Sequence, residues 1–538
     1  MLVYGDHSER LNAELGLDKV CSRLAEARKF EGLDRHSRLV GALVETGRIV
    51  QGLEDANFPQ SERLVAFACE LASCILRSWD SGFQDSGDWP DPPSIGSGVP
   101  VELKLPEGFA YYAIYPEAYA EAARRLALSG TPRVIGIRSI GTALGAVAAA
   151  ALGAPPPVTV RPRGDPSARL AELPETVLDD QAHYVIVDEG PGLSGSSFGA
   201  VADWLEDHGV PTERIAFLTS HDEELGPHAS ARHRERWLRA QRVPATFAFG
   251  FLAAAFGPLE ECRGNNPFGR LKFLGQSPSG KVLLKFAGLG SIGERKLEMS
   301  RALHSAGLTP EPLGLVHGFL AEHWHDDALC LAPEDKPVSE IGQYIGTRAR
   351  LFPAGEGEGA TIEELVVMCR RNASLAIGQD LAGSLDRWDA GALSLAVQRV
   401  RTDNKLDRSS WLRLSDGHLL KTDAVDHHCA HDLIGCQDPC WDVAGAIIEF
   451  ALDEEEACEL VCTAEQSASR PLSAALIDFY QIAYCCFRLG QARLAGELCA
   501  DSGESARLSS RAVRYETALM PMLKDDYCCF TSQKSLVD

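Results

Sequence analysis

The stretch "HYVIVDEGPGLSGSSFGAVADWLEDHG", residues 183 to 209, changes character three times along its length. An apolar run ends in two acids, Asp188 and Glu189; a Gly- and Ser-rich loop follows, and an amphipathic segment then begins. This order predicts a strand, a loop and a helix. Ligands bind at the carboxyl ends of parallel strands, and the N–H groups at a helix start favour phosphate. The stretch therefore predicts a phosphate site beside two carboxylates.

The same alternation continues on both sides of this stretch. "RVIGI" at 133–137 is followed by the helical pattern "GTALGAVAAAAL" at 141–152, and "RIAFLTS" at 214–220 closes the series. Strands that alternate with helices predict a parallel sheet flanked by helices. We expect an α/β domain over residues 101–250. It is preceded by a helical N-terminal region, 1–79, and by a Gly-, Pro-, Ser- and Asp-rich linker, 80–100.

Three segments of this domain resemble motifs of type I phosphoribosyltransferases. The P-loop and dinucleotide patterns do not fit, because no Lys follows the loop and the glycine spacing differs. Instead, the apolar run, the two acids and the turn "SGSS" at 194–197 resemble the family's diphosphoribosyl-binding motif. "VIGIRSIGTALGA" at 134–146 resembles its pyrophosphate loop, and "TVRPRGDPSARL" at 159–170 lies in the chain region of its flexible lid.

The resemblance implies a transfer of the phosphoribosyl group from phosphoribosyl diphosphate, with Mg as cofactor, to an acceptor that the sequence does not identify. The catalytic residues implied are Asp188 and Glu189, which would hold the ribose hydroxyls. The substrate-binding residues implied are Arg138, Ser139, Gly141, Arg161, Arg163, Ser194, Gly195, Ser196 and Ser197. The chain departs from the family pattern in having one residue more between Asp188 and Gly195. The alternative interpretation is an ordinary strand–helix turn that carries incidental acids and serines.

The remainder of the chain, residues 265–538, predicts a second α+β domain. "RLKFLGQSPSGKVLLKF" predicts a hairpin with a turn at 277–280, and its second strand carries Lys285. A helix with Glu294 and Glu298 follows. A strand Lys that pairs with a helix Glu holds nucleotide phosphates in kinase-like enzymes, so these three residues are the predicted nucleotide-binding set.

Residues 401–450 resemble the catalytic core of aminoglycoside-phosphotransferase-like kinases. The resemblance implies that Asp403 is the catalytic-loop Asp, that Asp423 binds Mg and that Asp442 of "DPCWDVA" braces the catalytic loop, with ATP as a second cofactor. Three departures oppose an active kinase. No His-Gly precedes Asp403, and Arg408 stands where the family has a metal-binding Asn. No clear Gly-rich phosphate loop precedes Lys285, only "GQSPSG" at 275–280. A kinase fold that only binds its ligand is therefore the alternative.

A zinc site is a weaker interpretation of "DHHCAHDLIGCQDPC", residues 426–440. Neither a CxxC pair nor an HExxH motif is present, and the spacing fits no common zinc pattern. The histidines are better explained as a polar wall of the kinase-like cleft.

Composition limits the partners and the compartment. The net charge of −24 over 538 residues opposes binding to nucleic acid, and no apolar run is long enough for a membrane span. Sixteen scattered cysteines without a framework favour reduced thiols and a cytoplasmic location. Nothing in the sequence excludes a homo-oligomer.

Two functions follow as expectations. The first is a phosphoribosyltransferase, an enzyme of the glycosyltransferase class, that is fused to a kinase-like domain which phosphorylates a small molecule. The second is a catalytically silent sensor, in which either fold binds phosphoribosyl diphosphate or a nucleotide without turnover and reports its presence to a partner.

Overall fold

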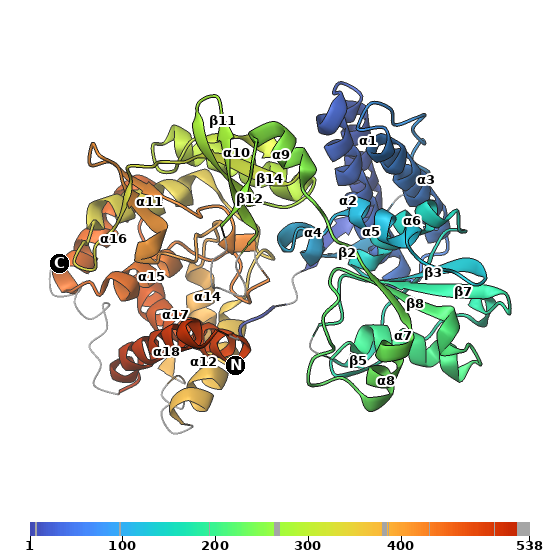
Figure 1. Ribbon diagram of the computed structural model, residues 1–538. Coiled ribbons are helices and arrows are strands. Elements are labelled where there is room, and N and C mark those ends of the chain that lie inside the picture. Colours follow the sequence, from blue (N-terminus) through green and yellow to red (C-terminus); the bar gives the residue numbers. More distant parts are fainter. Residues whose placement is uncertain are drawn as a thin grey trace.

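The computed structural model describes residues 1–5, 8–95, 98–192, 194–262, 270–378, 385, 387–429, 431–499 and 501–524 (Figure 1). The predicted break between the domains lies partly outside these residues, at 263–269. The N-terminal half contains β1 (Ser8–Asn12), α1 (Ala13–Ala27), α2 (Gly32–Asp55), α3 (Ser61–Asp80), β2 (Pro100–Lys104), α4 (Glu107–Tyr111), α5 (Pro116–Arg124), β3 (Thr131–Ile137), α6 (Ile140–Leu152), β4 (Val158–Val160), β5 (Arg163–Asp165), β6 (Ala168–Leu170), β7 (Ala182–Val187), α7 (Ser196–Asp207), β8 (Ile215–Thr219), α8 (Ala231–Arg239), β9 (Gln241–Pro244) and α9 (Gly250–Phe256).

The predicted parallel sheet is confirmed. Its strand order is β4-β3-β7-β8-β9, and every neighbouring pair in it is parallel. Side chains of β7 alternate between two apolar cores, with Tyr184 and Ile186 on one face and Val185 and Val187 on the other. A strand that is buried on both faces reads as a continuous apolar run, which explains why "YVIV" is so distinct in the sequence.

Helices cover both faces of this sheet. Helices α2, α3 and α5 contact α6 on one side, and α7 and α8 share the core of the other side through Phe198 and Trp237. The N-terminal helices therefore form part of the layer over the sheet (Figure 1). The predicted linker lacks helix and strand between Asp80 and Pro100 in the described residues.

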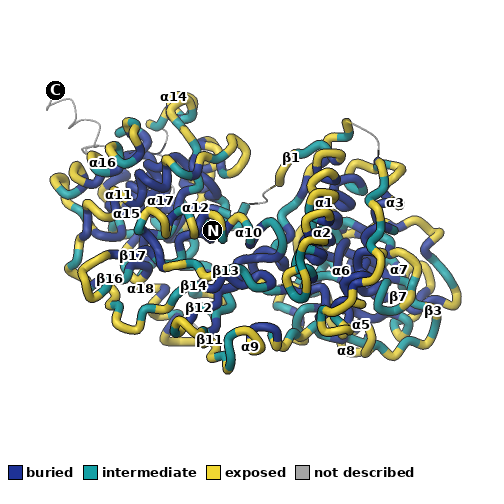
Figure 2. Tube along the Cα trace, turned by 90° about the horizontal axis from the view of Figure 1, so that it is seen from above, coloured by how far each residue is buried: buried dark blue, intermediate teal, exposed yellow. Residues whose placement is uncertain are grey.

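The C-terminal half begins with a second sheet. It contains β10 (Glu260–Glu261), β11 (Lys272–Ser277), β12 (Gly280–Phe286), α10 (Ser291–Ser305), β13 (Pro312–Val316) and β14 (Phe319–His323). Its strands run antiparallel in the order β10-β11-β12-β14-β13, and Ser277 pairs with Gly280 at the predicted hairpin turn. Val282, Leu284 and Phe319 share one apolar core with the helices and sheet of the N-terminal half. Figure 2 shows the buried segments of both halves and of the strands between them.

A helical lobe completes the chain. It contains β15 (Leu329–Cys330), α11 (Val338–Leu351), α12 (Ile362–Ile377), α14 (Ala390–Ala396), β16 (Trp411–Arg413), β17 (Leu419–Lys421), α15 (Cys440–Phe450), α16 (Glu454–Ala468), α17 (Ala474–Leu498) and α18 (Ser502–Met522). This lobe has a core that also includes Met299 and Leu303 of α10 and Leu320 of β14, and Val3 inserts into it from the other end of the chain. Leu2 exchanges two hydrogen bonds with Asn372, at 2.7 and 2.9 Å, so the N-terminal residues tie the two halves together.

Buried polar contacts join the antiparallel sheet to the N-terminal half. The carboxylate of Glu117 on α5 bonds Nε2 of His36 on α2, at 2.6 Å, and Nε2 of His317 between β13 and β14, at 3.0 Å. On the surface of the same interface, Arg23 of α1 makes a bidentate pair with Glu294 of α10, at 2.7 and 2.8 Å. Among the described residues, no helix is both long and apolar enough to cross a membrane.

Candidate functional site

A cavity of about 520 Å³ opens at the carboxyl edge of the parallel sheet. From β3 the chain goes to β4 on one side and then to β7 on the other, so the strand order reverses between β3 and β7. Such a reversal leaves a crevice at the strand ends, where ligands bind. The lining residues are Lys104, Leu105, Glu107, Ile137, Arg138, Ser139, Ile140, Arg161, Pro162, Arg169, Asp188, Glu189, Gly190 and Ser197.

Two glycines allow the loops to approach this crevice. A Cβ on Gly141, at the start of α6, would lie 2.4 Å from the carbonyl oxygen of Val187. A larger residue would thus push the loop after β3 away from the acids. Gly195 adopts φ 62°, and a Cβ there would meet His233 and Leu225 within 3 Å. Glycine alone combines this backbone with this space at the start of α7.

Asp188 and Glu189 lie at the end of β7, as the sequence predicts. The backbone N–H of Glu189 donates to Asp188 Oδ1 at 2.8 Å, and the buried Tyr119 hydroxyl donates to the carbonyl oxygen of Asp188 at 2.8 Å. Burial raises the pKa of Asp188 to about 7. Burial and the neighbouring Asp188 raise the pKa of Glu189 to about 8. Both carboxyls therefore lack enough positive charge around them to remain ionised at low cost.

The predicted pyrophosphate arginines meet on a residue that the sequence did not single out. Arg161 Nε lies 2.8 Å from both carboxylate oxygens of Asp55, and Arg138 Nη1 lies 3.0 Å from Asp55 Oδ1. Asp55 ends α2, so the helical N-terminal region positions both arginines beside the cavity. A helix end far along the chain from β3 gave no local signal in the sequence.

The serine turn contacts the hairpin formed by β5 and β6. Ser194 Oγ and Ser196 Oγ donate to the carbonyl oxygen of Pro166, at 3.0 and 2.6 Å, while Ser197 lines the cavity. Arg163 is exposed on β5 and lies outside the cavity lining. Of the predicted substrate-binding set, the cavity thus brings together Arg138, Ser139, Arg161 and Ser197.

A second polar cluster lies in the C-terminal half around Lys285. Lys285 Nζ pairs with the carboxylates of Asp423 and Asp426. The predicted partners lie elsewhere, because Glu294 pairs with Arg23 and Glu298 is exposed. The expectation of a Lys285–Glu pair is therefore corrected.

The phase of α10 explains this difference. Its buried positions lie along one face of the helix and are Ile292, Gly293, Lys296, Met299, Ser300 and Leu303. Glu294 and Glu298 fall outside this face. Lys296 falls on it and pairs with Asp426 at 2.9 Å. A lysine in phase with an apolar stripe was the signal available in the sequence.

Asp403 is held in place from several directions. The carboxylate of Asp442 accepts the backbone N–H groups of Asp403 and Asn404 at 2.7 and 2.9 Å, the bracing contact that the resemblance implies. The carboxylate of Asp403 accepts the hydroxyl of Tyr344 and lies 3.2 Å from Lys421 Nζ. Burial alone would raise the pKa of Asp403, but Lys421 holds it below its ordinary value.

The two residues near the expected metal position differ in what they contact. Arg408 donates to the carbonyl oxygens of Asp335 and Phe450 and does not replace the missing metal-binding Asn. Asn404 Nδ2 donates to the carbonyl oxygen of Gly435 at 2.7 Å. Asn404 Oδ1 is buried and has no hydrogen-bond partner among the described residues, so this oxygen is the available acceptor beside Asp403.

The acids of this cluster are matched by the protein's own cations. Asp423 Oδ1 contacts Lys285 and lies 3.6 Å from Lys272, and Asp423 Oδ2 lies 3.2 Å from Lys405. Despite burial, Lys285 and Lys405 hold the pKa of Asp423 well below its ordinary value. Because ammonium groups already bind both oxygens, the arrangement does not fit a Mg ion on Asp423.

The positions of His427 and His428 agree with the interpretation that the histidines of 426–440 form a polar wall of the kinase-like cleft. His427 lies 3.7 Å from Asp403 and 3.8 Å from Asp423, and burial lowers its pKa to about 4. His428 is buried, and burial lowers its pKa well below the ordinary value. Within the described residues, the group with metal-ligand geometry is instead His36, Glu117 and His317 at the interface of the halves.

Several solved structures of other proteins are similar to about half of this chain. No family model and no curated protein matches the sequence. The choline kinase LicA from Streptococcus pneumoniae is 18% identical, with a TM-score of 0.35, over 50% of this chain and 96% of that one. A choline/ethanolamine kinase family protein from Mesorhizobium loti is 17% identical, with a TM-score of 0.32, over 51% and 95%. Spectinomycin phosphotransferase in complex with ADP and spectinomycin is 12% identical, with a TM-score of 0.33, over 50% and 92%.

Proposed function

We propose that the cavity at the edge of the parallel sheet binds phosphoribosyl diphosphate and that the chain is a Mg-dependent phosphoribosyltransferase. The observation that carries the proposal is the convergence of two carboxylates, two arginines and Ser197 on one cavity at the strand-order reversal. These groups come from three separate loops of the chain. Incidental residues of a single turn would not be expected to converge in this way.

Each part of the ligand has a matching group. Arg138 and Arg161 would bind the pyrophosphate, and Ser197 at the start of α7 would bind the 5-phosphate. Asp188 and Glu189 would accept hydrogen bonds from the ribose hydroxyls. The two desolvated carboxyls also fit Mg, which binds through one or two carboxylates and substrate phosphates. When bound, Mg would neutralise the leaving pyrophosphate.

The chemistry requires the protein mainly to position the reactants. The bond from C1 of the ribose to the pyrophosphate oxygen breaks, and a bond from C1 to an acceptor nitrogen forms. A purine or pyrimidine N–H loses its proton to solvent, whereas a pyridine nitrogen carries no hydrogen and becomes a pyridinium. Arg138 and Arg161 stabilise the negative charge that develops on the leaving pyrophosphate. Asp55 pairs with both guanidinium groups and keeps them oriented before the substrate binds.

The test is acceptor-dependent release of pyrophosphate. The full chain is incubated with Mg, phosphoribosyl diphosphate and a panel of purine, pyrimidine and pyridine bases. The proposal expects release with one acceptor class and loss of release in Asp188→Asn. Glu175→Gln, an acid outside the cavity lining, is the matched control. Binding of phosphoribosyl diphosphate without release for any acceptor would favour the sensor hypothesis, and absence of binding would reject the site.

A second candidate function concerns the Lys285 cluster. Five lysines face three aspartates in this cluster, which leaves an excess of positive charge. The lysines are Lys272, Lys285, Lys296, Lys405 and Lys421, and the aspartates are Asp403, Asp423 and Asp426. This excess supports a nucleotide or another polyanion as ligand, bound without a metal ion on Asp423. The same cluster opposes phosphotransfer in the arrangement described, because the Asp403 carboxylate is 1% exposed and already bonded. Transfer of the γ-phosphate of ATP to a small hydroxyl or amino compound would instead support the kinase hypothesis.

A further inference from the structure

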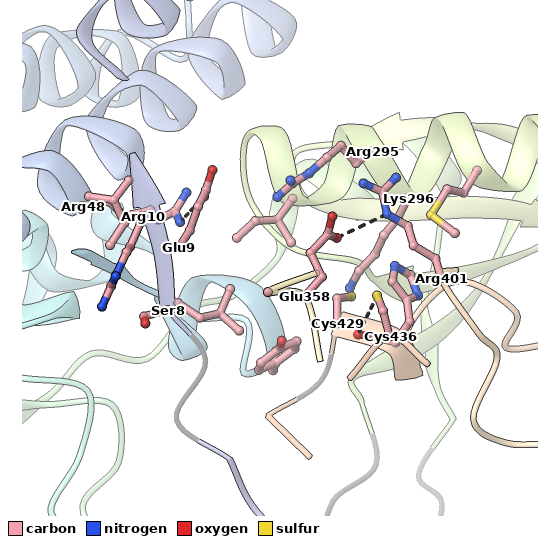
Figure 3. A pocket seen from close by; sticks show the side chains of 17 residues that line it. Ser8, Glu9, Arg10, Arg48, Arg295, Lys296, Glu358, Arg401, Cys429 and Cys436 are labelled. Atoms are coloured by element: carbon pink, nitrogen blue, oxygen red, sulfur yellow. Dashed lines mark hydrogen bonds and ion pairs between the residues drawn. The ribbon is translucent and has the colours of Figure 1, made fainter. Parts of the chain in front are cut away.

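A second cavity, of about 360 Å³, lies between the two halves of the chain (Figure 3). One wall comes from β1, α2 and the segment that follows β2, and carries Arg10, Arg48 and Leu105. The opposite wall comes from α10 and from the segments around 358, 401 and 428–436. The cavity is as large as the smaller known binding sites for organic ligands, which begin at about 300 Å³.

The cavity is cationic in a strongly acidic protein. Its basic lining residues are Arg10, Arg48, Arg295, Lys296 and Arg401. Its acidic lining residues are Glu9 and Glu358, so the lining carries an excess of three positive charges in a chain of net charge −24. Glu9 is paired with Arg48 at 3.1 Å, and Glu358 with Arg401 at 3.6 Å. Lys296 is paired with Asp426, which lies outside the lining, at 2.9 Å. Arg10 and Arg295 supply the remaining excess, which favours an anionic ligand.

Two residues of the lining carry buried polar atoms without a partner. Tyr111 Oη and His428 Nδ1 have no hydrogen-bond partner among the described residues, and the two residues are 6% and 7% exposed. Lys296 is 2% exposed, and its Nζ is held by Asp426 at 2.9 Å. Buried polar groups in native proteins are usually hydrogen-bonded, so two unpartnered groups around one cavity indicate a ligand that supplies acceptors and donors.

The rest of the lining is apolar. Leu103, Leu105, Ile292 and Met299 line the cavity, and Leu105 and Ile292 pack with Tyr111. The guanidinium of Arg270 lies 4.6 Å from the centre of that ring. A planar ring of a ligand can pack against such a surface while its anionic group reaches the arginines. The lining therefore combines a ring site with a phosphate site.

The cavity also lies between the two polar sites. Leu105 lines both this cavity and the cavity at the edge of the parallel sheet. On the other side, Lys296 lines the cavity and pairs with Asp426 of the Lys285 cluster. A molecule in this cavity therefore adjoins both sites.

We propose that the cavity between the halves binds a nucleoside monophosphate, a molecule with a planar ring and one phosphate, as an intermediate that moves between the two sites. The role as an intermediate rests on the proposed function, because transfer of a phosphoribosyl group to a ring nitrogen yields this class of product. The phosphate binds Arg295 and Lys296 of α10. The ring packs against Leu105 and Tyr111, whose hydroxyl bonds a ring substituent.

The experiment titrates the full chain with UMP, CMP, AMP and GMP by calorimetry, with ribose 5-phosphate as the probe without a ring. We expect saturable binding of at least one monophosphate and weaker binding of ribose 5-phosphate. Arg295→Glu should weaken that binding by at least about tenfold, the effect of one lost hydrogen bond to a charged group. Arg301→Glu, an exposed arginine on the same helix outside the lining, should leave it unchanged.

A second variant keeps the proposal testable if the Arg295→Glu protein does not fold. Tyr111→Phe keeps the ring and removes only the unsatisfied hydroxyl, so it should weaken monophosphate binding while ribose 5-phosphate binds as before. Equal affinities in the wild type, Arg295→Glu and Tyr111→Phe would overturn the proposal, as would no binding of any monophosphate at millimolar concentration.

Release of pyrophosphate, measured in the same variants, separates the two proposals. Arg295-dependent monophosphate binding without any release rejects the transferase and keeps the cavity. Release without Arg295-dependent binding rejects the cavity and keeps the transferase.

Discussion

The two carboxyls at the end of β7 predict a steep pH dependence of ligand binding. The pKa of Asp188 is raised to about 7 and that of Glu189 to about 8, chiefly because both are buried. If the cavity binds phosphoribosyl diphosphate with Mg as proposed, at least one of the two carboxyls must be ionised. With a pKa near 7, Asp188 is ionised in about a tenth of molecules at about pH 6 and in about nine tenths at about pH 8.

The affinity should therefore rise about tenfold from about pH 6 to about pH 8 if Asp188 alone must ionise, and further if Glu189 must ionise as well. Calorimetry at several pH values, in two buffers of different ionisation enthalpy, measures both the affinity and the protons released. Asp188→Asn should bind more weakly and flatten the pH dependence. Affinity that stays constant or falls over this range, with no proton released, would refute the reasoning.

The same raised pKa values determine whether the ligand-free protein becomes more or less stable as the pH rises. A carboxyl whose pKa is higher in the folded state stabilises the fold fully below its unfolded pKa, near 4, and loses this contribution as the pH rises through its folded pKa. For Asp188 the loss is at most about 4 kcal/mol between about pH 4 and about pH 8. Asp188→Asn should thus raise the melting temperature at about pH 8 more than at about pH 5.

Three further predictions concern the interface between the halves and the C-terminal half. Glu117→Ala removes the carboxylate that bonds Nε2 of both His36 and His317, and should lower the free energy of unfolding by about 3–5 kcal/mol in urea titrations; a cost below about 1 kcal/mol would show that the contact is dispensable. Asp442→Ala leaves two buried backbone N–H groups without their acceptor and should cost about 2–5 kcal/mol, with Asp442→Asn in between. ATP should bind with similar affinity in Mg and in EDTA, because lysines occupy Asp423; a strong Mg requirement in calorimetry would contradict this.

The parallel sheet could be predicted because its signals are local. The run "YVIV" is apolar on both faces of β7, and the Gly- and Ser-rich loop after it marks the start of α7. Asp188 and Glu189 followed directly from that order. The loop after β3 could be predicted for the same reason, since Gly141 permits its approach to Val187.

Contacts between distant segments could not be predicted in this way. Asp55 binds Arg138 and Arg161 across more than eighty residues of chain, and nothing at the end of α2 marks it as part of a site. The docking of Leu2 against Asn372 is longer still in sequence. Such contacts depend on how helices pack, which a single sequence encodes only through the whole fold.

The choice between Glu294, Glu298 and Lys296 illustrates a different failure. Chemistry favours a glutamate as the partner of Lys285, but helix phase decides which side chain faces inward. The apolar stripe of α10 places Lys296 inside, and Asp426 then takes the role of the acid. The period of the apolar residues in α10 therefore predicts the inward-facing side chain better than residue type does.

The two halves are not independent units, because part of the antiparallel sheet shares an apolar core with the N-terminal half. Leu284 and Phe286 of β12 and Phe319 of β14 pack in the same apolar core as the layer over the parallel sheet, whereas Leu320 of β14 packs in the core of the helical lobe. Lys285 alternates along β12 with Leu284 and Phe286, so it lies on the other face of the strand, where Nζ pairs with Asp423 and Asp426. Asp426 also pairs with Lys296, which lines the cavity between the halves. A ligand that displaces Asp426 from Lys285 therefore also changes the lining of this cavity, so occupancy at the Lys285 cluster and in the cavity is expected to be coupled.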